Sequence, residues 1–378
     1  MKKTTVHMAW DCEEVGRRFR TGVSLHSHTL HSREVLQSII RLAHTLPVVA
    51  PLVRRQERRY RAIHHHSFDA SRVWWTPPMT PRAAYALEAG FISEHLGLTP
   101  LVSLTDHDNI EAPLALRVLN DTREAPISVE WTVPWNETFF HFGVHNLPSG
   151  GAQSMMQQLS AFTASPRRRR LLELLDWLAE DPAVLIVLNH PCWDEKGIGK
   201  QAHRDEFVAL LQAARSWIHA LEANGLRPWA ENREVAQRCR ATGLPLISGG
   251  DRHGREPNAI LNLTNAGSFA EFVGEVRGDG WSDVYFAAHA AESRTLRVYR
   301  TLCDILRDDP AHGLGWVRWS DRVFYQFASG EVTALSAAWK TGPPHVVRWF
   351  VDLVKLCDHD RLAPAIRALG GLRREMAL

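Results

Sequence analysis

The segment Val23-Ser24-Leu25-His26-Ser27-His28 decides how this sequence is interpreted, because a short apolar run ends in two histidines one residue apart. If residues 23–25 form a β-strand, successive side chains point to opposite faces, so His26 and His28 project in the same direction at its carboxyl end. Two neutral imidazoles on one side of a strand end can hold one divalent cation. The chain has 20 histidines, so the pair alone is weak evidence and has to be weighed with the rest of the sequence.

The same pattern returns along the chain. Further strands are predicted at 101–105, 127–129, 139–144, 184–188, 218–221 and 245–247, and polar side chains follow or interrupt these runs. Helices are predicted at 34–46, 81–96, 167–179 and 233–239. Seven strands that mostly alternate with helical segments favour parallel pairing. Polar residues at the carboxyl ends of the strands are typical of the active-site face of a TIM barrel.

Composition sets limits on the class of protein. The length of 378 residues suits two domains, or one barrel with additions, and 45% hydrophobic residues supply a sizeable core. A net charge of +2 gives no argument for nucleic acid or an anionic membrane as partner. Five cysteines without a CxxC motif indicate free thiols in a reducing compartment. No apolar run is long enough for a signal peptide or a bilayer span, so a cytoplasmic protein is expected.

Two regions depart from the repeating pattern. Residues 47–79 are rich in arginine and proline and are predicted to be an irregular insert after the first strand. Its His64-His65-His66 run is interpreted as a solvated loop rather than a metal site. Beyond residue 265, helical segments are predicted at 292–309, 344–357 and 361–376, with a short hairpin at 316–326. We therefore predict a domain at 1–265 and a mostly helical C-terminal extension at 266–378.

The residues at the strand ends include six histidines and two carboxylates. They are His26, His28, His107, Glu130, His141, His190, Asp251 and His253. Nitrogen and oxygen ligands suit Zn, Mn or Fe, and a carboxylate that bridges two ions suits a polynuclear site. Any one of these residues is more often structural than a ligand, but their joint placement favours a metal centre.

At these positions the sequence resembles the PHP (polymerase and histidinol phosphatase) family of metal-dependent phosphoesterases. The matching motifs are Leu25-His-Ser-His-Thr29, Leu104-Thr-Asp-His-Asp108, Val129-Glu130, Phe140-His-Phe-Gly143, Leu188-Asn-His-Pro191 and Ser248-Gly-Gly-Asp-Arg-His253, in the family's order over residues 23–265. The resemblance implies an α/β fold, a distorted (βα)7 TIM-like barrel with two or three divalent ions in its mouth.

The resemblance also implies which residues hold each ion. His26, His28, Glu130 and Asp251 would hold the first ion, and Glu130 would bridge to a second ion held by His141 and His190. His107 and His253 would help to hold a third. The family usually supplies an aspartate to that ion where this chain has Arg33, so Glu34 is the expected substitute and His31 is a weaker one.

The implied reaction is hydrolysis of a phosphate ester by metal-bound hydroxide. Arg252, Arg33 and Arg255 are candidates to offset charge on the phosphate, and Asp106 either orients His107 or caps a helix. The substrate is expected to be a phosphorylated metabolite, a nucleotide or a nucleic-acid end, with no membrane partner. Two alternatives remain: an amidohydrolase-type metal-dependent hydrolase, and a catalytically degenerate binding protein with the same fold.

Overall fold

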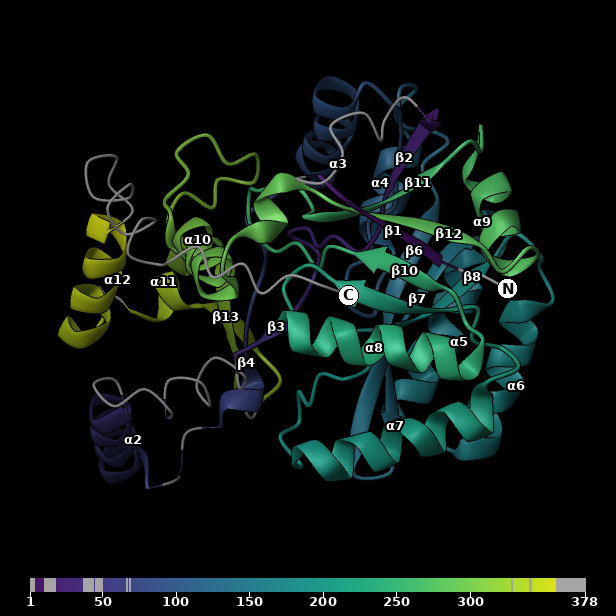
Figure 1. Ribbon diagram of the computed structural model, residues 1–378. Coiled ribbons are helices and arrows are strands. Elements are labelled where there is room, and N and C mark those ends of the chain that lie inside the picture. The colour runs from purple at the N-terminus through teal and green to yellow at the C-terminus, as the bar shows by residue number, and fades with distance from the viewer. Residues whose placement is uncertain are drawn as a thin grey trace. The chain divides into compact units, whose positions relative to one another are not determined.

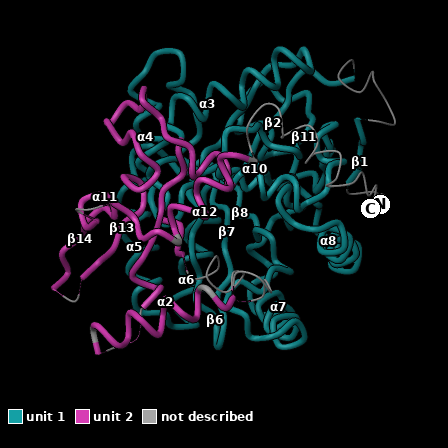
Figure 2. The backbone as a smooth tube through the Cα atoms, turned by 90° about the vertical axis from the view of Figure 1, so that its left-hand side faces the viewer, with its two compact units in different colours: residues 1–32, 79–301, 370–378 teal, residues 33–78, 302–369 magenta. Residues whose placement is uncertain are grey.

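The computed structural model describes residues 4–9, 18–36, 44, 50–65, 67, 69–327, 329–339 and 342–357. The chain divides into two compact units, coloured separately in Figure 2. Unit 1 contains residues 1–32, 79–301 and 370–378, and unit 2 contains residues 33–78 and 302–369. The predicted boundary after residue 265 falls inside unit 1, and the predicted insert at 47–79 belongs to unit 2 together with the later part of the chain.

Unit 1 contains two five-stranded sheets (Figure 1). The first has the order β1 (Thr4–Met8), β12 (Ser282–Phe286), β11 (Ile260–Thr264), β2 (Thr21–Ser24) and β5 (Thr99–Val102). The second has the order β10 (Leu246–Gly249), β9 (Ala220–Asn224), β8 (Leu185–Asn189), β7 (Thr138–Leu147) and β6 (Ile127–Trp135). The seven predicted strands are all present, and β1, β11 and β12 add to them.

The pairing of the strands is mixed rather than uniformly parallel. β2 pairs with β5, and β9 pairs with β8 and β10, in parallel as predicted. β6, β7 and β8 pair antiparallel, and here the prediction was wrong. Only Asn136 and Glu137 separate β6 from β7, and Asn136 has a positive φ of 47°. So short a turn can join only antiparallel strands.

The two sheets of unit 1 contact each other. One isolated bridge joins Ser27, which follows β2, to Arg252, which follows β10. A second joins His107, which follows β5, to Glu130 of β6. Apolar side chains from both sheets also share one buried cluster, in which Val23 and Leu25 lie with Val187 and Ile247. Helix α9 (Phe269–Arg277) contributes its buried face to the same cluster. Whether these strands form a closed barrel stays a prediction.

Helices cover both sheets of unit 1. The remaining helical segments of this unit are α3 (Pro81–Gly90), the π-helical η3 (Phe91–His95), α4 (Glu111–Arg117), α5 (Ala152–Ala164), α6 (Arg168–Ala179), α7 (Lys200–Ala214), α8 (Trp229–Thr242), η4 (Ala288–Ala291) and α10 (Arg294–Leu306), which continues into unit 2. Of these, α3, η3 and α4 pack against the first sheet and α5 to α8 against the second. α3 begins as predicted, with Thr80 as N-cap and Pro81 in the first turn. Leu171 and Leu175 of α6 are fully buried in the largest core.

Unit 2 is built around a four-stranded sheet. Its order is β14 (Val332–Ala334), β13 (Val323–Gln326), β4 (Val73–Trp75) and β3 (Glu34–Val35). Helical segments are α2 (Ala50–His64), η2 (Ala70–Arg72), η5 (Trp319–Arg322), α11 (Leu335–Ala338) and α12 (His345–Cys357). Over the described residues, no helix of either unit combines the length and apolarity needed to cross a bilayer.

Several predictions for these segments need correction. The insert at 47–79 is not irregular, because it contains α2 and the sheet strand β4. The hairpin lies at 323–334 rather than 316–326. The predicted helix at 34–46 begins instead as strand β3, and most of its remainder, like the predicted helix at 361–376, lies outside the described residues.

Candidate metal centre

The carboxylate of Glu130 lies at the centre of five imidazoles. This residue is 1% exposed and sits in the middle of β6, not at a strand end as predicted. Its Oε2 lies 2.9 Å from His26 Nε2, 3.3 Å from His28 Nε2 and 3.4 Å from His107 Nδ1. Its Oε1 lies 3.1 Å from His190 Nε2 and 3.6 Å from His141 Nδ1. One carboxylate therefore has ring nitrogens around both of its oxygens.

Asp251 forms a second carboxylate position beside the first two histidines. Its Oδ1 lies 3.4 Å from His28 Nε2 and 3.7 Å from His26 Nε2. The same oxygen lies 3.4 Å from His253 Nδ1. Arg227 donates a hydrogen bond to the other oxygen, Oδ2, over 3.2 Å. Asp251 thus links the histidines that follow β2 to the one that follows β10.

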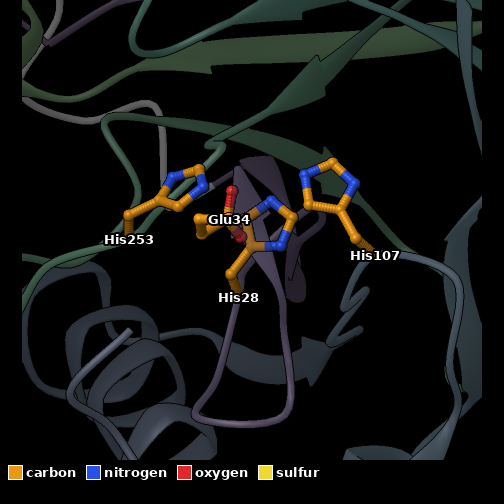
Figure 3. Close-up of side chains that lie close together, drawn as sticks. All are labelled: His28, Glu34, His107 and His253. Atoms are coloured by element: carbon orange, nitrogen blue, oxygen red, sulfur yellow. The ribbon is translucent and has the colours of Figure 1, made fainter. Parts of the chain in front are cut away.

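Three histidines from different loops stack on one another (Figure 3). The ring of His28 lies between those of His107, at 4.8 Å, and His253, at 4.3 Å between centroids. Each ring offers a nitrogen within 4.8 Å of the other two. Ser32 Oγ accepts a hydrogen bond from His107 N and is 3.2 Å from His28 Nδ1. Figure 3 also labels Glu34, which belongs to unit 2, so its part in this group stays a prediction.

The backbone at this site adopts an uncommon conformation. His26, His190 and Asp251 have positive φ values of 62°, 26° and 54°, and Asp108 has 52°. Such residues cost about 1–3 kcal/mol each and cluster at functional sites. At His26, His190 and Asp251 the chain turns just after its strand. The side chains of His26 and His190 then lie against Glu130, and the side chain of Asp251 lies near those of His26 and His28.

The donor atoms fit a divalent cation. His26 Nδ1 hydrogen-bonds Glu222 Oε1, so the Nε2 atom of the same ring points at Glu130 Oε2. Both Nε2 and this oxygen are buried without a hydrogen-bond partner. If Nδ1 carries the ring proton, two lone pairs face each other across 2.9 Å, and a cation between them would satisfy both.

Electrostatics keeps the carboxylates ionised. Burial raises the pKa of Glu130, but the neighbouring His26, His107 and His141 outweigh burial and hold this pKa well below its usual value. Burial also raises the pKa of Asp251, but the hydrogen bond with His28 and the nearby His253, His26 and Arg227 lower it well below its ordinary value. These two groups therefore present full negative charges to a bound ion.

The histidines of the centre respond in opposite directions. Burial, and then the neighbouring imidazoles, lower the pKa of His141 well below 6.5, so this ring is neutral, as a metal ligand must be. Burial lowers the pKa of His26, but Glu130 and Glu222 outweigh burial and raise it well above 6.5. Between His26 and Glu130 the site therefore favours positive charge, either as a proton or as a metal ion.

Glu222 is a site residue that the sequence analysis did not select. It lies on β9, is 1% exposed, and accepts hydrogen bonds from His190 N over 2.7 Å and Asn224 Nδ2 over 3.0 Å, as well as contacting His26 Nδ1. Its carboxylate orients His26, which is how such outer carboxylates act on metal-bound histidines. The signal was an acidic residue directly after the apolar run 218–221.

Two of the residues predicted to act in catalysis, Arg252 and Asp106, are bonded within the loops that carry the histidines. Arg252 is buried, and its guanidinium donates to Glu88 over 2.8 Å, to Gly254 O and to His28 O, so it holds loops together. Asp106 accepts from Thr29 N and Thr29 Oγ1 and braces the loop after β2. Arg33 lies in unit 2, with its guanidinium 5.4 Å from the centre of the Trp74 ring. These contacts fix the loops around the centre, and the predicted catalytic roles of Arg252 and Asp106 stay predictions.

No family model matches the chain, and no curated protein sequence matches it. The chain is similar to solved structures at low identity. An amidohydrolase from Chromobacterium violaceum with bound sulfate and no metal has 16% identity and a TM-score of 0.32, covering 47% of this chain and 83% of its own. A protein provisionally described as a metal-dependent phosphoesterase from Bifidobacterium adolescentis has 14% identity and a TM-score of 0.33, covering 53% and 91%.

A third similar structure is that of PsfC from Pseudomonas syringae PB-5123. It has 14% identity and a TM-score of 0.38, and the alignment covers 75% of this chain and 97% of PsfC. At these identities and TM-scores, none of the three structures assigns a fold or a function to this chain. The function has to be inferred from the side chains around Glu130.

Proposed function

We propose that the protein is a metal-dependent phosphoesterase that hydrolyses a phosphate ester, with two or three divalent ions of Zn, Mn or Fe at the centre around Glu130. The observation that carries the proposal is the single buried carboxylate with histidine nitrogens around both oxygens. A carboxylate in that position can bridge two cations, and paired cations suit the clamping of phosphate oxygens.

Each ion has its own ligand set in this proposal. The first is held by His26, His28, Glu130 and Asp251, and the second by Glu130, His141 and His190. The third is held by His107 and His253 with Glu34. Two residues of extended chain span at most about 7 Å, so Glu34 stays close to Ser32, whose hydroxyl contacts His28 and His107.

The reaction adds water to phosphorus, breaks the ester P–O bond and releases an alcohol and phosphate. Bound divalent ions supply Lewis acidity and lower the pKa of water toward neutrality. The chain keeps Glu130 and Asp251 ionised and His141 neutral, and Glu222 fixes the orientation of the His26 ring. We place the substrate among phosphorylated metabolites, nucleotides and nucleic-acid ends.

We also propose that β2, β5, β6, β7, β8, β9 and β10 form the distorted seven-stranded barrel. The bridges Ser27–Arg252 and His107–Glu130, together with the apolar cluster shared by both sheets, support this order. The ligands then come from the loops after β2, β5, β8 and β10 and from β6 and β7, at one mouth.

The test measures metal content and turnover together. Wild-type protein should contain at least two transition-metal ions per chain by mass spectrometry and should hydrolyse p-nitrophenyl phosphate with added Mn²⁺. Glu130→Gln should lose both bridged ions and activity, whereas His190→Ala should lose chiefly one ion. Glu173→Gln, on the exposed face of α6, is the matched control and should change neither.

The outcomes separate the alternatives. Protein that takes up neither Zn²⁺ nor Mn²⁺ would refute the metal centre. Metal-loaded protein that hydrolyses amides but no phosphate ester would favour the amidohydrolase alternative. Metal-loaded protein without hydrolytic activity toward a panel of both would favour a binding protein.

A further inference from the structure

Two arginines share the ring of Trp193 beside the metal centre. The guanidinium carbon of Arg227 lies 4.0 Å from the ring centroid, and that of Arg294 lies 5.9 Å from it. Trp193 follows β8, Arg227 follows β9 and Arg294 begins α10, so three separate segments of unit 1 meet here. Arg294 is fixed in addition by a hydrogen bond from its Nε to Leu226 O over 3.0 Å.

Arg227 has unused hydrogen-bonding capacity. Its side chain is 14% exposed, and its Nη2 donates to Asp251 Oδ2. Its Nε is buried without a hydrogen-bond partner. A guanidinium carries five donors in a planar fork, and the bond to Asp251 uses one of them. The guanidinium of Arg227 lies over the Trp193 ring, and this contact restricts the position of the guanidinium.

We propose that Arg227, stacked on Trp193, binds the phosphoryl group of the substrate and forms an anion subsite next to the metal ions. The inference deepens the proposed phosphoesterase function and rests on it. Arg294 supports the subsite by keeping its positive charge on the same ring.

The distances make one phosphoryl group able to reach both the ions and this arginine. The carboxylate of Asp251 lies between Arg227 and the histidines of the centre. Its Oδ2 accepts a hydrogen bond from Arg227 Nη2, and its Oδ1 lies 3.4 Å from His28 Nε2. Planar, bidentate recognition of phosphate oxygens is the contact for which arginine is suited.

Charge also favours an anion here. Arg227 and Arg294 face one ring, and their like charges repel each other, which a bound anion would relieve. The arginine predicted from the sequence for this role, Arg252, is buried against Glu88. Arg227 differs from Arg252 in that its guanidinium bonds the carboxylate side chain of a predicted metal ligand, Asp251.

The experiment titrates metal-loaded protein with inorganic phosphate by calorimetry. Arg227→Gln should weaken phosphate binding about tenfold to a hundredfold, the usual range for loss of a charged hydrogen bond. Arg227→Lys, which keeps the charge and loses the fork, should fall between this variant and wild type. Arg204→Gln is the matched control, because Arg204 pairs with Glu234 on α8 away from the centre, and its affinity should not change.

Metal content and turnover complete the test. The metal content of Arg227→Gln should equal that of wild type, and KM for p-nitrophenyl phosphate should rise. Unchanged phosphate affinity in Arg227→Gln would overturn the inference, as would loss of metal from both Arg227 variants, which would make the arginine a support for Asp251 alone. Phosphate binding that depends on Arg227 in a protein that hydrolyses no phosphate ester would refute the proposed function and leave the anion subsite standing.

Discussion

At the scale of single residues, Glu34 is the residue on which the proposed third ion depends. The stack of His28, His107 and His253 offers three nitrogens, and a cation there needs a carboxylate to balance its charge. Glu34 follows Ser32 by two residues and is the expected source, because Arg33 stands where an acidic ligand is usual in the PHP family.

We therefore predict that Glu34→Gln lowers the metal content by one ion per chain and reduces turnover. The change keeps the size of the side chain and removes only its charge. Mass spectrometry of the metal-loaded protein, with Glu57→Gln on α2 as control, measures the difference. Full metal occupancy in the Gln variant would instead leave the three histidines as the complete ligand set.

The residues of the centre show how far a sequence can go at this scale. Histidines and acids beside apolar runs could be identified from the sequence because a buried polar group costs free energy unless it is hydrogen-bonded, paired or bound to a metal. Glu222 was passed over because nothing in a linear pattern tells that its carboxylate reaches across to His26. The bond of Arg252 to Glu88 could not be predicted for the same reason, since Glu88 lies 164 residues earlier.

At the scale of elements, the end of β10 depends on a glycine. A Cβ at Gly249 would lie 1.5 Å from Glu222 Oε1, so β10 can approach the Glu222 carboxylate only without a side chain at this position. Gly274 in α9 gives a contrast, because a Cβ there would meet nothing within 4 Å.

Gly249→Ala should lower the free energy of unfolding by about 1–3 kcal/mol, the usual cost of overpacking, and weaken metal binding by displacing Glu222. Gly274→Ala should raise the free energy of unfolding by up to about 1 kcal/mol, since alanine favours a helix interior. Urea unfolding and metal titration of both variants measure these changes. Equal stability of the two variants would show that β10 can move aside without cost.

The elements predicted correctly were those with a clear local signal. α3 has a capping threonine and a first-turn proline, and α6 has leucines at helical spacing. The antiparallel course of β6 and β7 was not predicted, because pairing direction depends on which strands become neighbours. The sequence predicts an irregular insert where α2 lies, because the arginines of α2 leave few apolar residues at helical spacing.

At the scale of the whole molecule, the half-buried His219 links stability to pH. Burial, and then the nearby Arg277 and Arg215, lower the pKa of His219 to about 3. His219 Nδ1 accepts a hydrogen bond from Ile186 N over 2.9 Å, which requires a neutral ring. In the unfolded chain the ring has its ordinary pKa of about 6.5 and takes up a proton more readily.

Stability from His219 is therefore fully present above about pH 6.5 and is lost as pH falls toward 3, at about 1.4 kcal/mol per pH unit. His219→Asn can still accept from Ile186 N and does not titrate. Its free energy of unfolding should thus fall less steeply than that of wild type between pH 7 and 5, in urea titrations with a chelator present. Parallel curves for the two proteins would contradict this assignment.

The left-handed backbone at His26, His190 and Asp251 has a consequence for protein engineering. Regular strand ends have negative φ, so the same side chains grafted onto the strands of another scaffold would point elsewhere. A transplant has to carry the turning loops along with the ligands, and the host must have several kcal/mol of surplus stability to tolerate them. Copying the ligand identities alone would reproduce the composition of this centre without its geometry.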